Sequence, residues 1–189
     1  MQHEANSLNT KHTLAEELRR QGAAAWPDGK VTVRSLVQSC GINRNTFYYH
    51  FSNIDELILW TLQSDLEKLQ QFDCTDGHGI RVFIMDYLDD NRTFLNFAFQ
   101  YVGFDPFRRA FISVMHKIIM EYIEYHDGQL GIRTDAMKAR VLADSFAEMT
   151  TALMVWYFRD EGKPSRLATG KVFDGVFTYG IPGLLAEKE

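Results

Sequence analysis

The sequence predicts an all-α protein. Apolar residues recur at spacings of three and four through most of the 189 residues, which is the period of an amphipathic helix. Residues that favour helix starts precede these runs, and glycine or proline separates them. One segment, 92–102, alternates like a strand at Phe97, Phe99 and Tyr101. We predict a helix there as well, because no second segment offers a partner strand.

The first predicted helix covers about 10–25 and ends before the Trp26-Pro27-Asp28-Gly29 sequence, where proline and glycine break the pattern. Two much shorter helices should follow. Thr32 and Asn43 are suited to cap their starts, and Gly41 between them tolerates a positive φ. Each cap is flanked by apolar residues in the arrangement of a hydrophobic staple, Val31 with Leu36 and Ile42 with Phe47.

Ser52 or Asn53 is predicted to begin the next helix, which should run over about 54–72. A loop is expected at 73–79 and another at 126–133, and Gly162 with Pro164 should end a helix. The last helix should start after Ser165 and kink at Pro182. The remaining helices are predicted over 80–89, 92–102, 107–122 and 142–156, which makes about nine in total.

The two short helices around Gly41 describe a helix-turn-helix, whose second helix enters the major groove of DNA. Phe47 and Phe51 are four residues apart and should point inward with Ile42. The other side of the second helix then exposes polar side chains that suit a groove. Arginine can pair with guanine, asparagine with adenine, and tyrosine or histidine with phosphate. These exposed residues are Arg44, Asn45, Thr46, Tyr49 and His50.

The charge distribution agrees in direction with this interpretation. Residues 1–54 carry six Lys and Arg against four Asp and Glu, whereas residues 55–189 carry fourteen against twenty-one, within a net charge of −5. An excess of positive charge in the N-terminal part favours contact with phosphates. Six basic residues make few such contacts, so high affinity would need two copies on one DNA.

The segment Val31–Leu57 resembles the DNA-binding region of the TetR/AcrR family, because Gly41-Ile42 followed by Thr46-Phe47-Tyr48 and His50-Phe51 matches the family pattern in order. The resemblance implies base contacts from Arg34, Arg44, Asn45 and Thr46, and phosphate contacts from Thr32, Tyr48, Tyr49 and His50. Ile54 departs from the family, which often has a phosphate-contacting lysine there. Segments 88–95 and 155–162 are similar to the branch of dihydroxyacetone-kinase regulators (DhaS-like).

Residues 1–53 are therefore expected to form a helix-turn-helix DNA-binding domain of three helices, and residues 54–189 a helical bundle for ligand binding and dimerisation. The resemblance implies a homodimer paired through the last helices and an effector cavity in the bundle. Aromatic and methionine side chains could line that cavity, although core packing is the default explanation for apolar residues at helical spacing. The candidates are Phe97, Tyr101, Phe111, Met115, Met149 and Trp156.

Composition limits the other classes of protein. No apolar run approaches the roughly 20 residues that span a bilayer, and Met1–Thr10 lacks the apolar stretch of a signal peptide. Cys40 and Cys74 suit a reducing cytoplasm and cannot make a structural zinc site alone. No metal, cofactor or enzymatic activity is predicted, since the sequence has no nucleophile elbow, phosphate loop or paired metal-ligand motif. The expected partners are double-stranded DNA and either a small molecule or a protein.

Overall fold

The computed structural model describes residues 2–69, 77–159 and 165–186, and every regular element in these ranges is helical. A π-helical turn, η1 (Val176–Gly180), joins the last two helices, α9 and α10, without a break. This continuous segment, Arg166–Ala186, is called the α9–α10 rod below and counts as one of nine helices in the described ranges. The all-α prediction is confirmed, including the helix at 92–102. The α-helices are α1 (Gln2–Ala25), α2 (Val33–Ser39), α3 (Arg44–His50), α4 (Ile54–Leu69), α5 (Gly77–Asp90), α6 (Arg92–Val102), α7 (Phe104–Leu130), α8 (Ala136–Arg159), α9 (Arg166–Gly175) and α10 (Ile181–Ala186).

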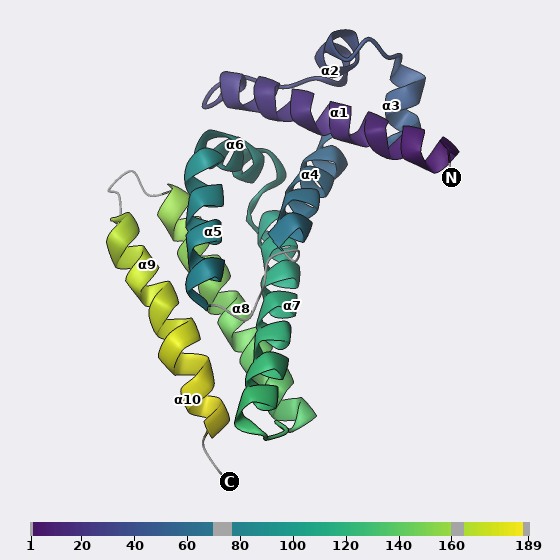
Figure 1. Cartoon of the computed structure of the whole chain (residues 1–189). Coiled ribbons are helices and arrows are strands. Elements are labelled where there is room, and N and C mark those ends of the chain that lie inside the picture. The colour runs from purple at the N-terminus through teal and green to yellow at the C-terminus, as the bar shows by residue number, and fades with distance from the viewer. Residues whose placement is uncertain (1, 70–76, 160–164, 187–189) are drawn as a thin grey trace. The chain divides into compact units, whose positions relative to one another are not determined.

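The helices form two compact units, which can be followed by residue number in Figure 1. The first unit comprises the described residues of Met1–Ser64 together with Asn91–Phe107, and so contains α1, α2, α3, most of α4 and α6. The second unit comprises the described residues of Asp65–Asp90 and Arg108–Glu189, and so contains α5, most of α7, α8 and the α9–α10 rod.

In the first unit, α1 packs against both α2 and α6. A Cβ atom on Gly22 would lie 2.6 Å from the ring of Phe97, so this glycine lets α6 approach α1 closely. Nη1 of Arg19 donates a hydrogen bond of 3.0 Å to Oδ1 of Asn91, and its guanidinium group lies 4.8 Å from the ring centroid of Phe94. The buried core of this unit includes Leu14, Leu18, Leu36, Phe47, Phe51, Leu57, Ile58, Leu62, Leu95 and Ala98.

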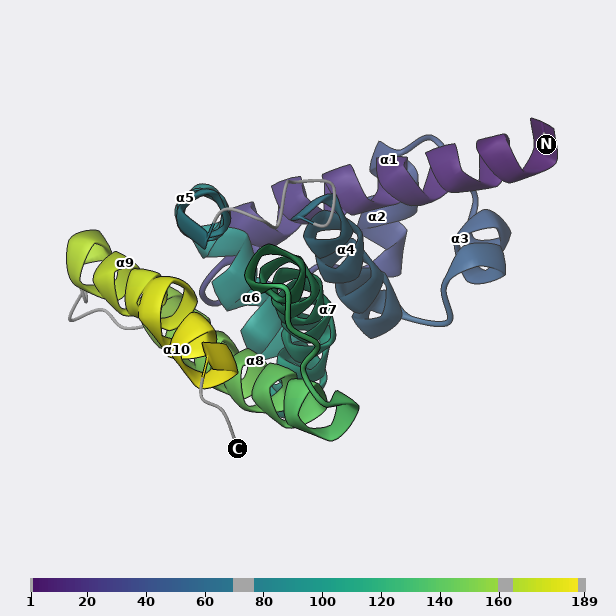
Figure 2. The same cartoon turned by 60° about the horizontal axis from the view of Figure 1, so that its bottom comes forward.

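In the second unit, the α9–α10 rod packs against α5 and α8, and Figure 2 shows the rod beside α8. Phe177 is fully buried, and a Cβ atom on Gly77 would lie 2.6 Å from its Cβ atom. The Tyr122 hydroxyl donates a hydrogen bond of 2.5 Å to the carbonyl oxygen of Phe177. Nε of Arg81 pairs with Asp174 at 2.6 Å, which joins α5 to α9. The rod is thus held by both apolar packing and charge.

The start of the rod was predicted correctly, because the Ser165 hydroxyl accepts the N–H of Ala168 at 3.0 Å. A π-helical turn precedes Pro182, and the kink predicted at this proline stays a prediction. There the N–H of Ile181 donates to the carbonyl of Val176, five residues back. Proline has no N–H to donate, and a π-helical turn redistributes the backbone hydrogen bonds beside it.

Several predicted boundaries were wrong, among them the start of α8, which lies at Ala136 rather than at residue 142. α1 begins at Gln2 rather than at residue 10, and Gly77–Gly79 belongs to α5 rather than to a loop. α7 continues through Gly128 to Leu130, although a loop was predicted from residue 126. Its end is fixed by Gly131, which has a φ of 63°, and by a 3.0 Å bond from the N–H of Ile132 to the carbonyl of Asp127. This is a Schellman motif, and an interior glycine such as Gly128 costs a helix only about 1 kcal/mol.

Some predictions fall outside the described residues, namely the end of the fourth helix at 70–72, the loop residues 73–76, and the helix end at Gly162 and Pro164. Within the described ranges, no helix is both long enough and apolar enough to cross a membrane.

Candidate DNA-binding interface

Helix α2 begins with a reciprocal pair of hydrogen bonds. Thr32 has extended backbone angles, φ −122° and ψ 152°, and its hydroxyl accepts the N–H of Ser35 at 3.1 Å. The Ser35 hydroxyl in turn accepts the N–H of Thr32 at 3.2 Å. This is a capping box with serine in place of the usual Glu or Gln, and it satisfies two backbone donors at the helix start. The Thr32 cap predicted from sequence is confirmed.

Helix α2 ends in a Schellman motif centred on Gly41. Gly41 has a φ of 65°, and the N–H of Ile42 donates to the carbonyl of Val37 at 3.0 Å. A Cβ atom on Gly41 would meet nothing within 4 Å. The left-handed backbone, rather than crowding, is therefore what favours glycine here. The turn directs the chain from α2 into α3, as the sequence predicted.

Helix α3 is only seven residues long, and Asn43 fixes its start. The Asn43 side-chain oxygen accepts the N–H of Thr46 at 2.8 Å and lies 3.2 Å from the Thr46 hydroxyl. On the inner side, Phe47 and Phe51 are 0% and 2% exposed, with ring centroids 6.1 Å apart. An isolated helix of this length is not stable in water. The cap and the two buried rings therefore hold α3 in place.

The opposite side of α3 is open to solvent. Arg44 and Asn45 are exposed at its first turn, and Tyr48 and Tyr49 are 56% and 74% exposed further along. Two large aromatic side chains are rarely left this exposed unless they contact a partner. The remaining predicted contact residues lie around this face: Thr32 and Arg34 are exposed at the start of α2, and Thr46 and His50 are half-buried on α3.

His50 differs from its exposed neighbours. Its Nδ1 atom lies 3.5 Å from the hydroxyl of Ser7 on α1, and its ring packs edge-on against Tyr49 with a centroid separation of 4.9 Å. Burial, and then the charge of Lys11, lower the pKa of the imidazole. His50 is therefore neutral at neutral pH. Any phosphate contact that it makes would be a neutral hydrogen bond rather than an ion pair.

Lys11 is a further candidate that the sequence analysis missed. It lies on α1, and its ammonium nitrogen is 5.6 Å from the ring centroid of Phe51 and 5.7 Å from that of Trp60. These contacts place a positive charge beside the end of α3. No local pattern links residue 11 to residue 50, so only the fold could bring them together.

A polar network joins α1 to α2 behind the exposed face. The carboxylate of Glu17 accepts hydrogen bonds from Nε of Arg20 at 2.9 Å and from the Gln21 amide at 2.6 Å. The hydrogen bond from Arg20, followed by those from Gln21 and Ser39, lowers the pKa of Glu17 to about 2. The Ser35 hydroxyl donates to the Gln21 side-chain oxygen at 2.7 Å. The capped start of α2 is thereby anchored to α1.

Residues 29–59, which include α2 and α3, match the family model described as bacterial regulatory proteins, tetR family. This segment therefore has the sequence of a TetR-family DNA-binding region. The resemblance predicted from Val31–Leu57 is confirmed over this segment. Ile54, where many TetR-family members have lysine, is buried at 7% exposure, so an apolar core side chain occupies that position.

Two further similarities concern DhaS proteins. Over 68 residues the chain is 32% identical to the HTH-type dhaKLM operon transcriptional activator DhaS of Lactococcus lactis subsp. lactis (strain IL1403), and the match spans 34% of this chain and 36% of that relative. A solved structure of the dihydroxyacetone kinase operon activator DhaS aligns with a TM-score of 0.63 over 94% of each chain, at 18% identity. This second similarity establishes a shared fold for nearly the whole chain.

The six residues predicted to line an effector cavity fall in different environments. Phe97 and Tyr101 line a pocket in the first unit, together with residues 27–30. Phe111 and Met115 on α7 are fully buried, whereas Met149 and Trp156 on α8 are 38% and 50% exposed. An effector role for these residues stays a prediction.

Proposed function

We propose that two copies of this chain bind a two-fold-symmetric operator, each inserting α3 into the major groove. The observation that carries the proposal is the construction of α3, which is capped by Asn43, held from inside by Phe47 and Phe51, and exposed along its outer side. Base contacts are assigned to Arg34, Arg44, Asn45 and Thr46, and phosphate contacts to Thr32, Tyr48, Tyr49 and His50.

The chemistry of the first turn supports base recognition. Arg44 can form two parallel hydrogen bonds to O6 and N7 of guanine, and Asn45 two to N6 and N7 of adenine. Both side chains are exposed, so neither must break a contact within the protein before it binds. Lys11, beside the end of α3, adds a positive charge that the same DNA backbone can neutralise.

Titration of the purified protein against the DNA upstream of its own gene tests this assignment. At low salt the protein should bind, and Arg44→Ala should weaken binding by about 1–3 kcal/mol. Arg133 offers a matched control, since it is an exposed arginine in the loop after α7. Arg133→Ala should leave DNA affinity unchanged. If the wild-type protein forms no complex with any operator-length DNA fragment, the proposal is wrong.

We also propose that the homodimer forms through α8 and the α9–α10 rod, which pack against each other in the second unit. Both elements leave apolar side chains uncovered. On α8 these are Met137, Val141, Met149 and Trp156, and on the rod Val172, Tyr179 and Leu184, with exposures of 38% to 76%. Apolar surface of this extent on neighbouring helices is typical of an interface. For both copies of α3 to enter the major groove of one operator, they must lie about one DNA turn, 34–36 Å, apart or a multiple of it.

Val172→Glu tests the dimer directly. The substitution places a charge on an exposed position of α9, so the fold of the protomer should be kept while the interface is disrupted. Light scattering should then report a monomer, and cooperative binding to a two-half-site operator should be lost. Wild-type protein that is monomeric at micromolar concentration would contradict the proposed dimer.

The proposed regulator is a cytoplasmic repressor that a small molecule releases from its operator, with residues 1–53 binding DNA and residues 54–189 carrying effector binding and dimerisation. A second candidate is control by a partner protein, with activation rather than repression. The names of both DhaS relatives, which call them activators, favour activation as the sign of regulation. Deletion of the gene distinguishes the sign of regulation, because transcription from the operator should rise for a repressor and fall for an activator.

A further inference from the structure

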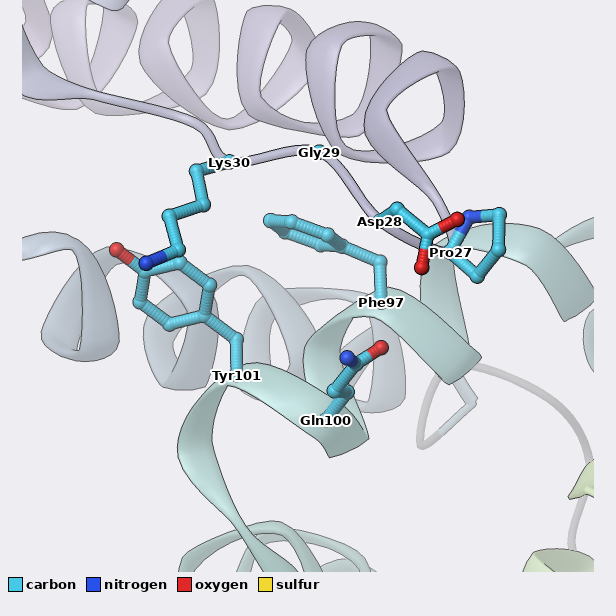
Figure 3. A pocket seen from close by; sticks show the side chains of 7 residues that line it. All are labelled: Pro27, Asp28, Gly29, Lys30, Phe97, Gln100 and Tyr101. Carbon is cyan, nitrogen blue, oxygen red and sulfur yellow. The ribbon is translucent and has the colours of Figure 1, made fainter.

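A pocket of about 410 Å³ lies in the first unit, between α6 and the loop that joins α1 to α2. Figure 3 shows the residues that line it: Pro27, Asp28, Gly29 and Lys30 from the loop, and Phe97, Gln100 and Tyr101 from α6. This volume falls within the range of small-molecule sites. All seven residues belong to one compact unit, so the pocket belongs to a single packed body.

The aromatic side of the pocket is rigid. Phe97 is 3% exposed, and its ring is packed where a Cβ atom on Gly22 would lie only 2.6 Å away. The rings of Phe97 and Tyr101 have centroids 5.5 Å apart and planes inclined by 44°. An apolar ring of a ligand could therefore pack on the exposed ring of Tyr101, beside the buried Phe97.

Polar groups stand at two ends of this aromatic surface. In Figure 3 the side chains of Lys30 and Tyr101 reach toward each other, while Asp28 lies on the other side of Gly29. Burial and the nearby charge of Asp55 raise the pKa of Tyr101, so its hydroxyl stays protonated and can donate a hydrogen bond. One end of the pocket thus offers an ammonium and a phenol, and the other a carboxylate.

The chemistry of these two ends limits the ligand. The Gln100 amide lies on the α6 side of the pocket and can donate or accept. A ligand that satisfies every group has a flat apolar body, an anionic end for Lys30 and Tyr101, and a hydrogen-bond donor for Asp28.

We propose that this pocket binds a small aromatic acid that carries a hydrogen-bond donor opposite its carboxylate, and that this ligand changes DNA affinity. The second half of the proposal rests on the proposed operator binding. The loop leads within two residues from Lys30 to Thr32, the cap of α2. A bound ligand that bridges the loop and α6 therefore constrains the start of the helix-turn-helix. It shifts DNA binding by the difference between its affinities for the DNA-bound and free conformations.

The experiment titrates the full-length protein, without DNA, with 4-hydroxybenzoate while the amide resonances of Gly29, Lys30 and Gln100 are followed by NMR. Saturable shifts centred on these residues are expected. Removal of the anionic end, in 4-hydroxybenzyl alcohol, should weaken binding about tenfold. Removal of the donor, in benzoate, should weaken it by a smaller factor.

Lys30→Gln and Tyr101→Phe supply the protein side of the test, because both preserve the size of the side chain. Lys30→Gln should weaken 4-hydroxybenzoate binding about tenfold, so that this variant binds the acid and 4-hydroxybenzyl alcohol with similar affinity. Lys171→Gln, at an exposed lysine on α9, should leave it unchanged. Absence of saturable shifts, or equal affinity for the acid and the alcohol, would overturn the binding proposal.

A separate titration of operator DNA with and without 4-hydroxybenzoate tests the regulatory half. Failure of DNA binding without ligand would refute the proposed function and leave the pocket result intact. If the protein binds both DNA and the acid but DNA affinity does not change, the pocket is a binding site and the effector role is wrong.

Discussion

Asn43→Ala should loosen α3 without disturbing the core behind it. The substitution removes the 2.8 Å hydrogen bond from the Thr46 N–H and leaves that donor exposed to water. Loss of an N-cap of this kind costs about 0.5–2 kcal/mol. The 3.2 Å contact with the Thr46 hydroxyl lies on the surface and adds little. We therefore expect a loss of about 1 kcal/mol, equivalent to a fall in melting temperature of about 2–4 °C for a chain of this size.

Amide hydrogen exchange locates the effect and separates it from general destabilisation. The Thr46 N–H should exchange about fivefold faster in Asn43→Ala, since 1.4 kcal/mol corresponds to a factor of ten. Asn43→Asp retains a capping oxygen and should remain close to wild type. Asn45→Ala, two residues along the chain, should leave exchange unchanged and weaken DNA binding. Equal exchange in Asn43→Ala and Asn43→Asp would refute the assigned role of the cap.

Three further perturbations test other parts of the account. Gly41→Ala should cost about 1–2 kcal/mol in a denaturant titration, because its φ of 65° disfavours a Cβ atom even where space is open; an unchanged midpoint would contradict the left-handed turn. The pKa of Glu17 is lowered from 4.5 to about 2, so the stability that this carboxylate contributes is present above pH 4.5 and is lost as the pH falls toward 2. Glu17→Gln should therefore flatten the dependence of stability on pH in this range. An unaltered pH dependence would exclude the Arg20–Glu17 contact as the cause of the acid destabilisation. Gly77→Ala should lower the melting temperature by overpacking Phe177, at a cost of about 1–3 kcal/mol, unless α5 can shift away from the rod.

The features that the sequence predicted well are governed by residues close to one another in the chain. Thr32 and Asn43 accept N–H groups only three residues away, and Gly41 adopts the positive φ that its place between two helices requires. Capping and glycine conformation depend on local geometry, so the pattern of side chains is sufficient. The exposed side of α3 followed from the same reasoning once Phe47 and Phe51 were placed inside.

The features that the sequence could not predict depend on contacts between distant segments. Lys11 comes to lie beside His50 only because α1 packs against the helix-turn-helix. No pattern in the sequence links Gly22 to Phe97, whose ring packs where a Cβ atom on Gly22 would lie. The continuation of α7 through Gly128 was missed for a local reason, since one exposed glycine costs a helix only about 1 kcal/mol and did not end it. The pocket beside Lys30 likewise exists only once α6 is placed against the loop.

Selection of binding sites from a random pool of duplex DNA tests the central claim most directly. Wild-type protein should recover a palindromic motif with two half-sites related by a whole number of helical turns. Arg44→Ala should recover DNA with the same half-site spacing but with preference lost at one position in each half-site. An unchanged motif from Arg44→Ala, or selection of no motif by the wild-type protein, would show that the exposed side of α3 does not read base edges.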